Sequence, residues 1–152
     1  MIGTRLAGGN GIQSVAFLPN SNCLTFVNAD QKLEGWDVIE GKTTFLLDIT
    51  AASEGKRTRG AHLAVAPNGR WLAVETVSRK GVDLWDIDGQ RLLIRLPVGS
   101  GTIWRLAWSP DGSLLAVARS DGSISIWNLP ETRRQLATLG LDWSEGASHQ
   151  MK

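Results

Sequence analysis

The stretch from Trp104 to Trp127 contains three short apolar runs separated by two turns. The runs, at 106–108, 114–118 and 124–127, are too short for helices and are rich in residues that favour strands. The segments between them read Ser-Pro-Asp-Gly and Ser-Asp-Gly, which place Pro and Gly where tight reversals need them. The stretch is therefore predicted to be a three-stranded antiparallel meander.

This meander occurs three times along the chain, and repetition constrains a fold more than any single strand does. The turn prolines are 48 and 43 residues apart, and the closing tryptophans are 49 and 42 residues apart. Both spacings therefore shorten by a similar amount from the first interval to the second. A fourth apolar run follows the first two copies, at 43–49 and 91–96. Each copy thus predicts a four-stranded unit of propeller-blade length. The landmark residues are Pro19, Pro67, Pro110, Trp36, Trp85 and Trp127.

The recurring pattern of Ala-Phe/Trp-Ser-Pro-Asp-Gly, Leu-Ala-Val and Asp-Gly-x-Ile-x-Ile-Trp-Asp resembles the WD40 repeat family over about residues 4–129. The resemblance implies an all-β fold of tandem four-stranded antiparallel blades of a WD40-type β-propeller, with about three blades in an incomplete ring. It also implies a non-catalytic scaffold for protein–protein interaction. The three closing tryptophans match the family's strand-C tryptophan, which fills the space between blades, and Asp30 and Asp121 match its turn aspartate.

The sequence departs from the family in its buried polar network. The family pairs the strand-C tryptophan with a strand-B Ser or Thr, but here those positions hold Phe26, Glu75 and Val117. Arg79 stands at the turn-aspartate position of the second copy, and no Gly-His dipeptide occurs. Stability is therefore expected to depend more on apolar packing between blades than on this network. Glu75 is expected to point outward or to pair with an arginine.

The ends of the chain carry two further expectations. Gly3–Leu6 aligns with 94–96, so the chain is expected to begin in the outer strand of a preceding blade and to belong to a longer propeller; the alternative is closure by self-association. Pro130, Glu131 and Gly140 favour a short C-terminal helix, with an outer strand at 135–139 as the alternative.

The predicted divisions are 1–10 outer strand and link, 11–49 blade 1, 50–60 basic link, 61–97 blade 2, 98–129 strands A–C of blade 3, and 130–152 C-terminal helix or outer strand plus tail.

Composition excludes several classes of function. The net charge of +1 argues against a chain-wide nucleic-acid surface, and the single Cys23 excludes an internal disulfide or a cysteine-based zinc site. His62 and His149, the only histidines, take part in no catalytic pattern. We therefore expect no enzymatic activity, no cofactor and no metal. The sequence shows neither an 18-residue apolar run nor a signal-peptide pattern, which predicts a cytoplasmic protein without membrane contact.

Five cations form the candidate binding site, in the link 50–60 and the turn 78–81. WD40 topology places such loops on one face, where they could bind an acidic or phosphorylated peptide of a protein partner. Ordinary solvated surface charge is the competing interpretation, and nucleic acid fits less well. A C-terminal segment similar to large bacterial WD40 proteins suggests an alternative function as a regulatory or sensor module of a signalling enzyme such as a serine/threonine kinase. The five cations are Lys56, Arg57, Arg59, Arg79 and Lys80.

Overall fold

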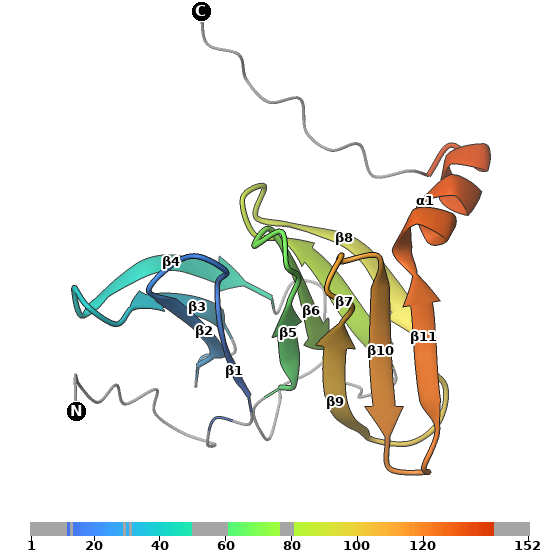
Figure 1. Cartoon of the computed structure of the whole chain (residues 1–152), viewed down its shortest axis with the longest axis horizontal. Helices are drawn as coiled ribbons and strands as arrows, with labels where there is room; N and C mark the ends of the chain where they lie inside the picture. Colours follow the sequence, from blue (N-terminus) through green and yellow to red (C-terminus); the bar gives the residue numbers. More distant parts are fainter. Residues whose placement is uncertain are drawn as a thin grey trace, which may run out of the picture.

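Three antiparallel sheets follow one another along the chain and stand side by side (Figure 1). The computed structural model describes residues 12, 14–28, 30, 32–49, 61–76 and 81–141. Each sheet starts at its innermost strand and adds the following strands in chain order. We call the sheets blades 1, 2 and 3. This arrangement confirms the predicted all-β fold of tandem antiparallel blades in an incomplete ring.

Blades 1 and 2 have four strands each, and blade 3 has three among the described residues. Blade 1 consists of β1 (Val15–Phe17), β2 (Cys23–Val27), β3 (Lys32–Asp37) and β4 (Lys42–Asp48). Blade 2 consists of β5 (Leu63–Val65), β6 (Trp71–Glu75), β7 (Gly81–Asp86) and β8 (Arg91–Pro97). Blade 3 consists of β9 (Ile103–Trp108), β10 (Leu114–Arg119) and β11 (Ile124–Asn128).

Local turn chemistry explains why the first two strands of each blade reverse where they do. Gly69 and Gly112 adopt a left-handed φ of +71°, which explains why glycine follows the Pro-Asn and Pro-Asp pairs. In blade 1, Asn20 takes φ 55°, a conformation that asparagine tolerates better than most residues. In blade 3, Asp111 accepts hydrogen bonds from the Ser109 hydroxyl and from the backbone N–H and hydroxyl of Ser113, which lower the pKa of Asp111 to about 2.

The hydrophobic core lies between blades rather than within them. One cluster joins blade 1 to blade 2 and includes Leu33, Leu72 and Trp85. A second cluster joins blade 2 to blade 3 and includes Leu84 and Leu115. A single sheet cannot shield its own apolar face from water, so each blade is held mainly by its neighbour.

The chain leaves blade 3 through a helix, α1 (Leu129–Thr138). The side chain of Asn128 caps the helix by accepting a hydrogen bond from the Glu131 N–H at 3.0 Å, and Pro130 occupies its first turn. Leu129 is fully buried in the second cluster, and Gly140 follows the helix with φ +71°. The predicted helix therefore forms, and the alternative outer strand at 135–139 is wrong. Among the described residues, no helix has the length and apolarity needed to cross a bilayer.

Two buried carboxylates brace blade 2 through paired hydrogen bonds to arginines. Asp83 accepts from Arg95 at 2.7 and 3.0 Å across β7 and β8. Asp86, only 1% exposed, accepts from Arg70 at 2.9 and 2.7 Å and from the Gly89 N–H at 3.2 Å. The Arg70 hydrogen bonds are the main reason that the pKa of Asp86 lies below its ordinary value.

The Asp86–Arg70 pair should stabilise the fold in a pH-dependent way. Because the folded pKa is lowered, the stabilisation is complete above the unfolded pKa of about 4 and is lost as pH falls through the folded pKa. Asp86→Asn should cost about 1.5–3 kcal/mol at neutral pH. In urea unfolding across an acidic pH series, this variant should lose less stability on acidification than the wild type. Asp30→Asn, at an exposed aspartate of blade 1, is the matched control. If the free energy of unfolding fell equally with pH in Asp86→Asn and in the wild type, the Asp86–Arg70 pair would not be a source of this pH dependence.

Candidate functional site at the inner strands

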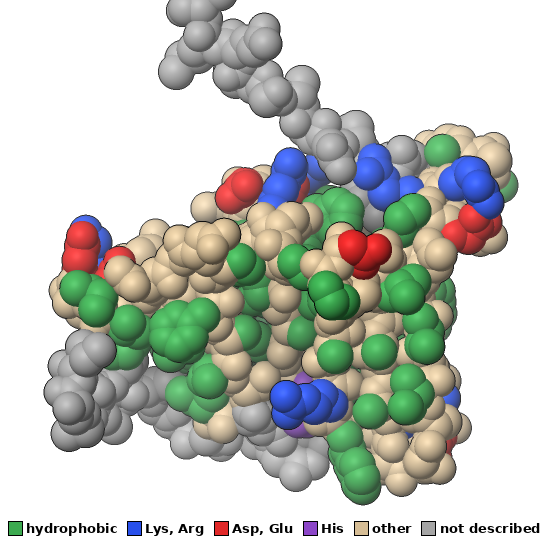
Figure 2. All heavy atoms as spheres, viewed as in Figure 1, with side chains coloured by type: hydrophobic (Ala, Val, Ile, Leu, Met, Phe, Trp, Pro, Cys, Tyr) green, Lys and Arg blue, Asp and Glu red, His purple; other side chains and the backbone are tan. Residues whose placement is uncertain are grey.

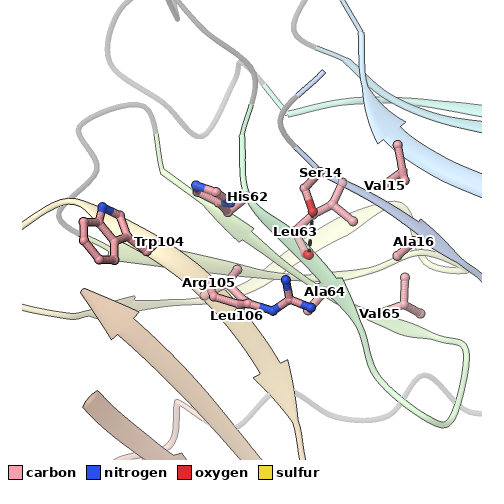
Figure 3. Close-up of a pocket in the computed structure, with 10 residues that line it drawn as sticks. All are labelled: Ser14, Val15, Ala16, His62, Leu63, Ala64, Val65, Trp104, Arg105 and Leu106. Carbon is pink, nitrogen blue, oxygen red and sulfur yellow. Dashed lines mark hydrogen bonds between the residues drawn. The ribbon is translucent and has the colours of Figure 1, made fainter. Parts of the chain in front are cut away.

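The innermost strands of the three blades border a cavity of about 450 Å³ (Figure 3). β5 lies between β1 and β9 and contacts both. Figure 2 shows apolar side chains over this face, interrupted by basic and histidine side chains. The polar and aromatic groups that line the cavity are Ser14, His62, Trp104 and Arg105.

Trp104 faces solvent because β9 contains a β-bulge. Ala118 of β10 pairs with Arg105 and Arg119 pairs with Ile103, which leaves Trp104 as the extra residue between them. Strict alternation would give Trp104 and Arg105 opposite faces, but both are exposed, and Trp104 reaches 64%. Ile103 on one side is fully buried in the core. The bulge thus presents an aromatic ring and a guanidinium together at the edge of the cavity.

The segment that enters the bulge is held by hydrogen bonds to the end of β10. The Arg119 guanidinium donates to the carbonyl oxygens of Val98 and Ser100. Thr102 and Ser120 are joined twice, since the Thr102 N–H donates to the Ser120 hydroxyl at 3.0 Å and the Ser120 N–H donates to the Thr102 carbonyl at 2.9 Å. These bonds fix the chain immediately before Trp104. The ring is therefore supported by ordered backbone on its N-terminal side.

Two hydrogen bonds between blades tie the inner strands together. The Ser14 hydroxyl of blade 1 donates to the Leu63 carbonyl of blade 2 at 3.2 Å, as the dashed line in Figure 3 marks. The Trp108 indole N–H of blade 3 donates to the Ala64 carbonyl at 3.0 Å. The Trp108 ring also lies 6.5 Å from that of Trp71. The cavity wall is thus continuous across three blades.

Glu75 supports the start of β5 from the end of β6. Its side chain is 2% exposed, and its Oε2 accepts a hydrogen bond from the His62 N–H at 3.3 Å. The Glu75 N–H donates to the His62 carbonyl at 2.9 Å. Glu75 does not point outward, because these contacts place it inside the blade; its pairing with an arginine stays a prediction. Its observed position fixes the backbone of His62 at the cavity.

The predicted site residues fall into two groups. The five cations lie outside the described residues, so their site stays a prediction. Trp85 is buried between blades 1 and 2, Trp127 packs against the cluster between blades 2 and 3, and Trp36 is half-buried. Asp121 accepts from the Ser123 N–H at 3.0 Å, and Asp30 is exposed. The turn prolines Pro19, Pro67 and Pro110 follow the first strand of their blades.

The indole nitrogens of Trp85 and Trp127 are buried without a hydrogen-bond partner among the described residues. This matches a sequence in which the neighbouring strand-B positions carry no hydroxyl. The described residues also contain no cluster of three or more His, Cys, Asp or Glu side chains that could hold a metal ion. The groups that this site offers to a ligand are an indole ring, a guanidinium, an imidazole and a hydroxyl.

Sequence reasoning missed Trp104 and Arg105 as exposed site residues. The signal was present in the length of β9, which has six residues where β1 and β5 have three. An innermost strand that begins earlier than its counterparts carries additional side chains to the cavity. Whether both would face outward depended on the bulge, which requires the register against β10.

The Trp108 hydrogen bond should contribute measurably to stability. Trp108→Phe retains an aromatic ring but removes the donor to the Ala64 carbonyl, so we expect a loss of about 1 kcal/mol in the free energy of unfolding. Trp104→Phe is the matched control, because its exposed ring should leave stability within about 0.5 kcal/mol. Urea unfolding followed by circular dichroism measures both. Equal losses in the two variants would show that the indole N–H of Trp108 does not brace the blades.

Comparison with known proteins agrees with the blade architecture. Residues 90–128, which run from β8 to β11, match the family model for the WD domain, G-beta repeat. The chain is 29% identical over 134 residues to small ribosomal subunit protein RACK1y of Oryza sativa subsp. japonica, covering 83% of this chain and 37% of that relative. It is 28% identical to RACK1 of Brassica napus, covering 82% and 41%.

A third relative, protein transport protein SEC13 of Pyricularia oryzae, is 22% identical, with coverage of 82% of this chain and 50% of the relative. The chain therefore spans half or less of the length of these curated relatives. The repeat match falls on strands whose sheet, turns and inter-blade packing are those of propeller blades. Residues 90–128 thus match a WD40 repeat in sequence, and the sheets around them have the architecture of tandem propeller blades.

Proposed function

We propose that the chain is a non-catalytic scaffold that binds an acidic segment of a partner protein at the mouth of the inner-strand cavity. The observation that carries this proposal is the exposed pair Trp104 and Arg105 on the bulge of β9. Tryptophan and arginine are the residues most enriched among those that dominate protein interfaces. Because Trp104 is 64% exposed, covering its ring with a partner would remove a large apolar surface from water and so contribute favourable free energy to binding.

The adjacent charges favour an acidic partner. Arg105 lines the cavity beside Trp104, and a guanidinium can donate two parallel hydrogen bonds to one carboxylate or phosphate. β5 and β9 run in the same direction (Figure 3), so His62 and Trp104 both lie where these strands begin. The mouth at this end therefore combines a cation, an imidazole and an aromatic ring.

The two segments that carry the five predicted cations lie outside the described residues, but described residues at this end of the cavity flank both of them in the sequence. The link 50–60 joins β5 just before His62, and the turn 77–80 follows directly after Thr76. His62 and Glu75 are hydrogen-bonded to each other, so the two cationic segments leave the described fold from neighbouring points. This supports a single acidic-ligand surface that combines Arg105 with Lys56, Arg57, Arg59, Arg79 and Lys80.

The relatives support a scaffold over an enzyme. They are named as small ribosomal subunit proteins and as a protein transport protein, and neither name denotes a catalytic activity. A cytoplasmic location accompanies this proposal. The role of a regulatory module in a serine/threonine kinase stays a prediction from the sequence alone, since nothing among the described residues favours it.

A displayed library of random peptides, panned against the full chain, tests the proposal. We expect enrichment of peptides that carry Asp or Glu beside an apolar residue, and binding that weakens as salt screens the charges. Trp104→Ala should reduce affinity for the resynthesised peptides at least tenfold, about 1.4 kcal/mol. Replacing the five cations with alanine should flatten the salt dependence.

Matched variants separate the site from general surface effects. Leu141→Ala removes an exposed apolar side chain and Lys42→Ala an exposed cation, and neither lines the cavity. Both should leave peptide affinity unchanged. If Trp104→Ala and the five-cation variant stay folded and bind every enriched peptide as the wild type does, the proposed surface is wrong. Failure to enrich any peptide would count against the scaffold function itself.

A further inference from the structure

A second groove, of about 550 Å³, lies between α1 and the first turns of blades 2 and 3. Leu129 is fully buried in the cluster between these blades, and Leu136 packs against the same cluster, so one side of the helix is fixed to the blades. The adjacent side of the helix forms a wall of the groove. Its lining residues are spaced i, i+3, i+4 and i+7, as one helix face requires: Pro130, Arg133, Arg134 and Ala137.

Two turns and an aromatic ring form the rest of the groove. The turn of blade 3 lies against that of blade 2, since a Cβ at Gly112 would be 3.5 Å from the Cδ of Pro67. In the blade 2 turn, the Asn68 side-chain oxygen accepts a hydrogen bond from the Trp71 N–H at 3.1 Å. Trp71 lines the groove, and its ring lies 6.5 Å from that of Trp108. These contacts fix the shape of the groove before any ligand binds.

The charges around the groove favour a ligand that carries carboxylates. Arg133 and Arg134 both line it, and Asp111 is the one acidic residue among the described residues of the lining. The Asp111 carboxylate accepts hydrogen bonds from two serine hydroxyls of its own turn. Glu131 pairs with Arg134 but does not line the groove. Because a guanidinium has five N–H donors, an arginine that already has a partner can still bind a second carboxylate.

The chain itself supplies a segment of suitable chemistry directly after the helix. Residues 142–146 read Asp-Trp-Ser-Glu-Gly, so a tryptophan stands between two carboxylates and the five residues include no cation. These residues lie outside the described part of the chain. Their carboxylates suit the two arginines, and the indole suits a floor that contains Trp71. In charge and in apolar content, the segment complements the groove.

The end of the helix brings this segment to the groove. The Leu141 N–H donates to the Leu136 carbonyl at 2.9 Å and the Gly140 N–H to the Ala137 carbonyl at 3.0 Å, so the chain turns back over the last helical turn. The helix rises about 10 Å between Pro130 and Ala137, and four extended residues span about 13 Å. Residues 142–145 can therefore reach the whole helix wall. Their tether also keeps them at a local concentration of about millimolar, which a separate molecule would have to match.

We propose that the groove between α1 and the turns of blades 2 and 3 binds residues 142–146 of the same chain. The Trp143 ring covers the floor, and the carboxylates of Asp142 and Glu145 pair with Arg133 and Arg134. β9 and β11 are both antiparallel to β10, so the groove, at the end of β11, lies at the opposite end of blade 3 from the start of β9 (Figure 1). The inference therefore does not depend on the proposed peptide site.

Photocross-linking in the full chain tests where the segment lies. With p-benzoylphenylalanine in place of Trp143, irradiation should join position 143 to groove residues of the same molecule, which mass spectrometry of the digested monomer identifies. Replacing both groove arginines, Arg133→Gln and Arg134→Gln, should lower the yield several-fold. Cross-links to other parts of the chain would overturn the proposal. So would cross-links that form only between copies, since they would make a second molecule the occupant.

Glu131→Gln is the matched control for the arginine variant. It breaks the same ion pair with Arg134 but leaves both groove arginines in place. Because an exposed pair of this kind contributes little to stability, the fold should be retained. The cross-linking yield should stay at the wild-type level. If Glu131→Gln lowered the yield as much as the arginine variant does, the loss would come from the helix and not from the groove, which would overturn the proposal.

Cleavage after Glu145 by a glutamate-specific protease measures docking without a photoreactive group. Cleavage follows the population of the undocked segment, so docking in nine molecules of ten slows it about tenfold. We expect the wild type to be cut about tenfold more slowly than Trp143→Ala. Free peptides of residues 142–152, with and without the same substitution, give the intrinsic rates for correction. Trp143→Ala changes no described residue, so equal corrected rates in the two chains would overturn the proposal.

Discussion

The structure depends on one repeated contact, in which the apolar face of one blade packs on the apolar face of the next. Leu63, Leu72 and Trp85 are buried at the first such contact, and Leu84, Leu115 and Val117 at the second. Each blade alone would expose one or both faces to water. The free energy of apolar burial is therefore realised between blades, and removing a neighbour uncovers an entire face at once.

This contact replaces a buried polar network as the main source of stability. Trp85 and Trp127 bury their rings while their indole nitrogens have no hydrogen-bond partner among the described residues. Burying an unpaired donor costs free energy, and the large ring area offsets that cost. Charged pairs act locally instead, with Asp83 and Asp86 bracing the strands of blade 2 through arginines. Blade 2, which has a neighbour on each side, is also the blade that carries these buried pairs.

The same architecture places the candidate binding surface. Three inner strands brought side by side leave a cavity that is lined by residues of all three blades. The bulge in β9 adds Trp104 and Arg105 to its mouth without disturbing the core, because Ile103 and Leu106 on either side remain buried. A rigid wall with a few projecting side chains suits recognition of a partner segment, since little ordering is required on binding.

The sequence by itself determined the strands, the turns and the terminal helix. These features depend on a few neighbouring residues: Gly69 and Gly112 supply left-handed turns, and Asn128 and Pro130 start the helix. The repeat spacing likewise predicted the blades and the family. The sequence also indicated that the polar network would be incomplete, because the absence of hydroxyls is visible without coordinates. The role of the five cations remains a prediction from sequence.

Only the tertiary structure decided which equivalent side chains are buried. Leu84 and Ile126 occupy the same position in consecutive blades, yet one is fully buried and the other 66% exposed. No local pattern separates them, because burial depends on whether another blade covers the face. The exposure of Trp104 similarly required the register between β9 and β10, which a one-residue bulge shifts. Neighbouring residues decide which segments form strands. Contacts between segments distant in the chain decide which blade faces are covered by a neighbouring blade and in which register the strands pair.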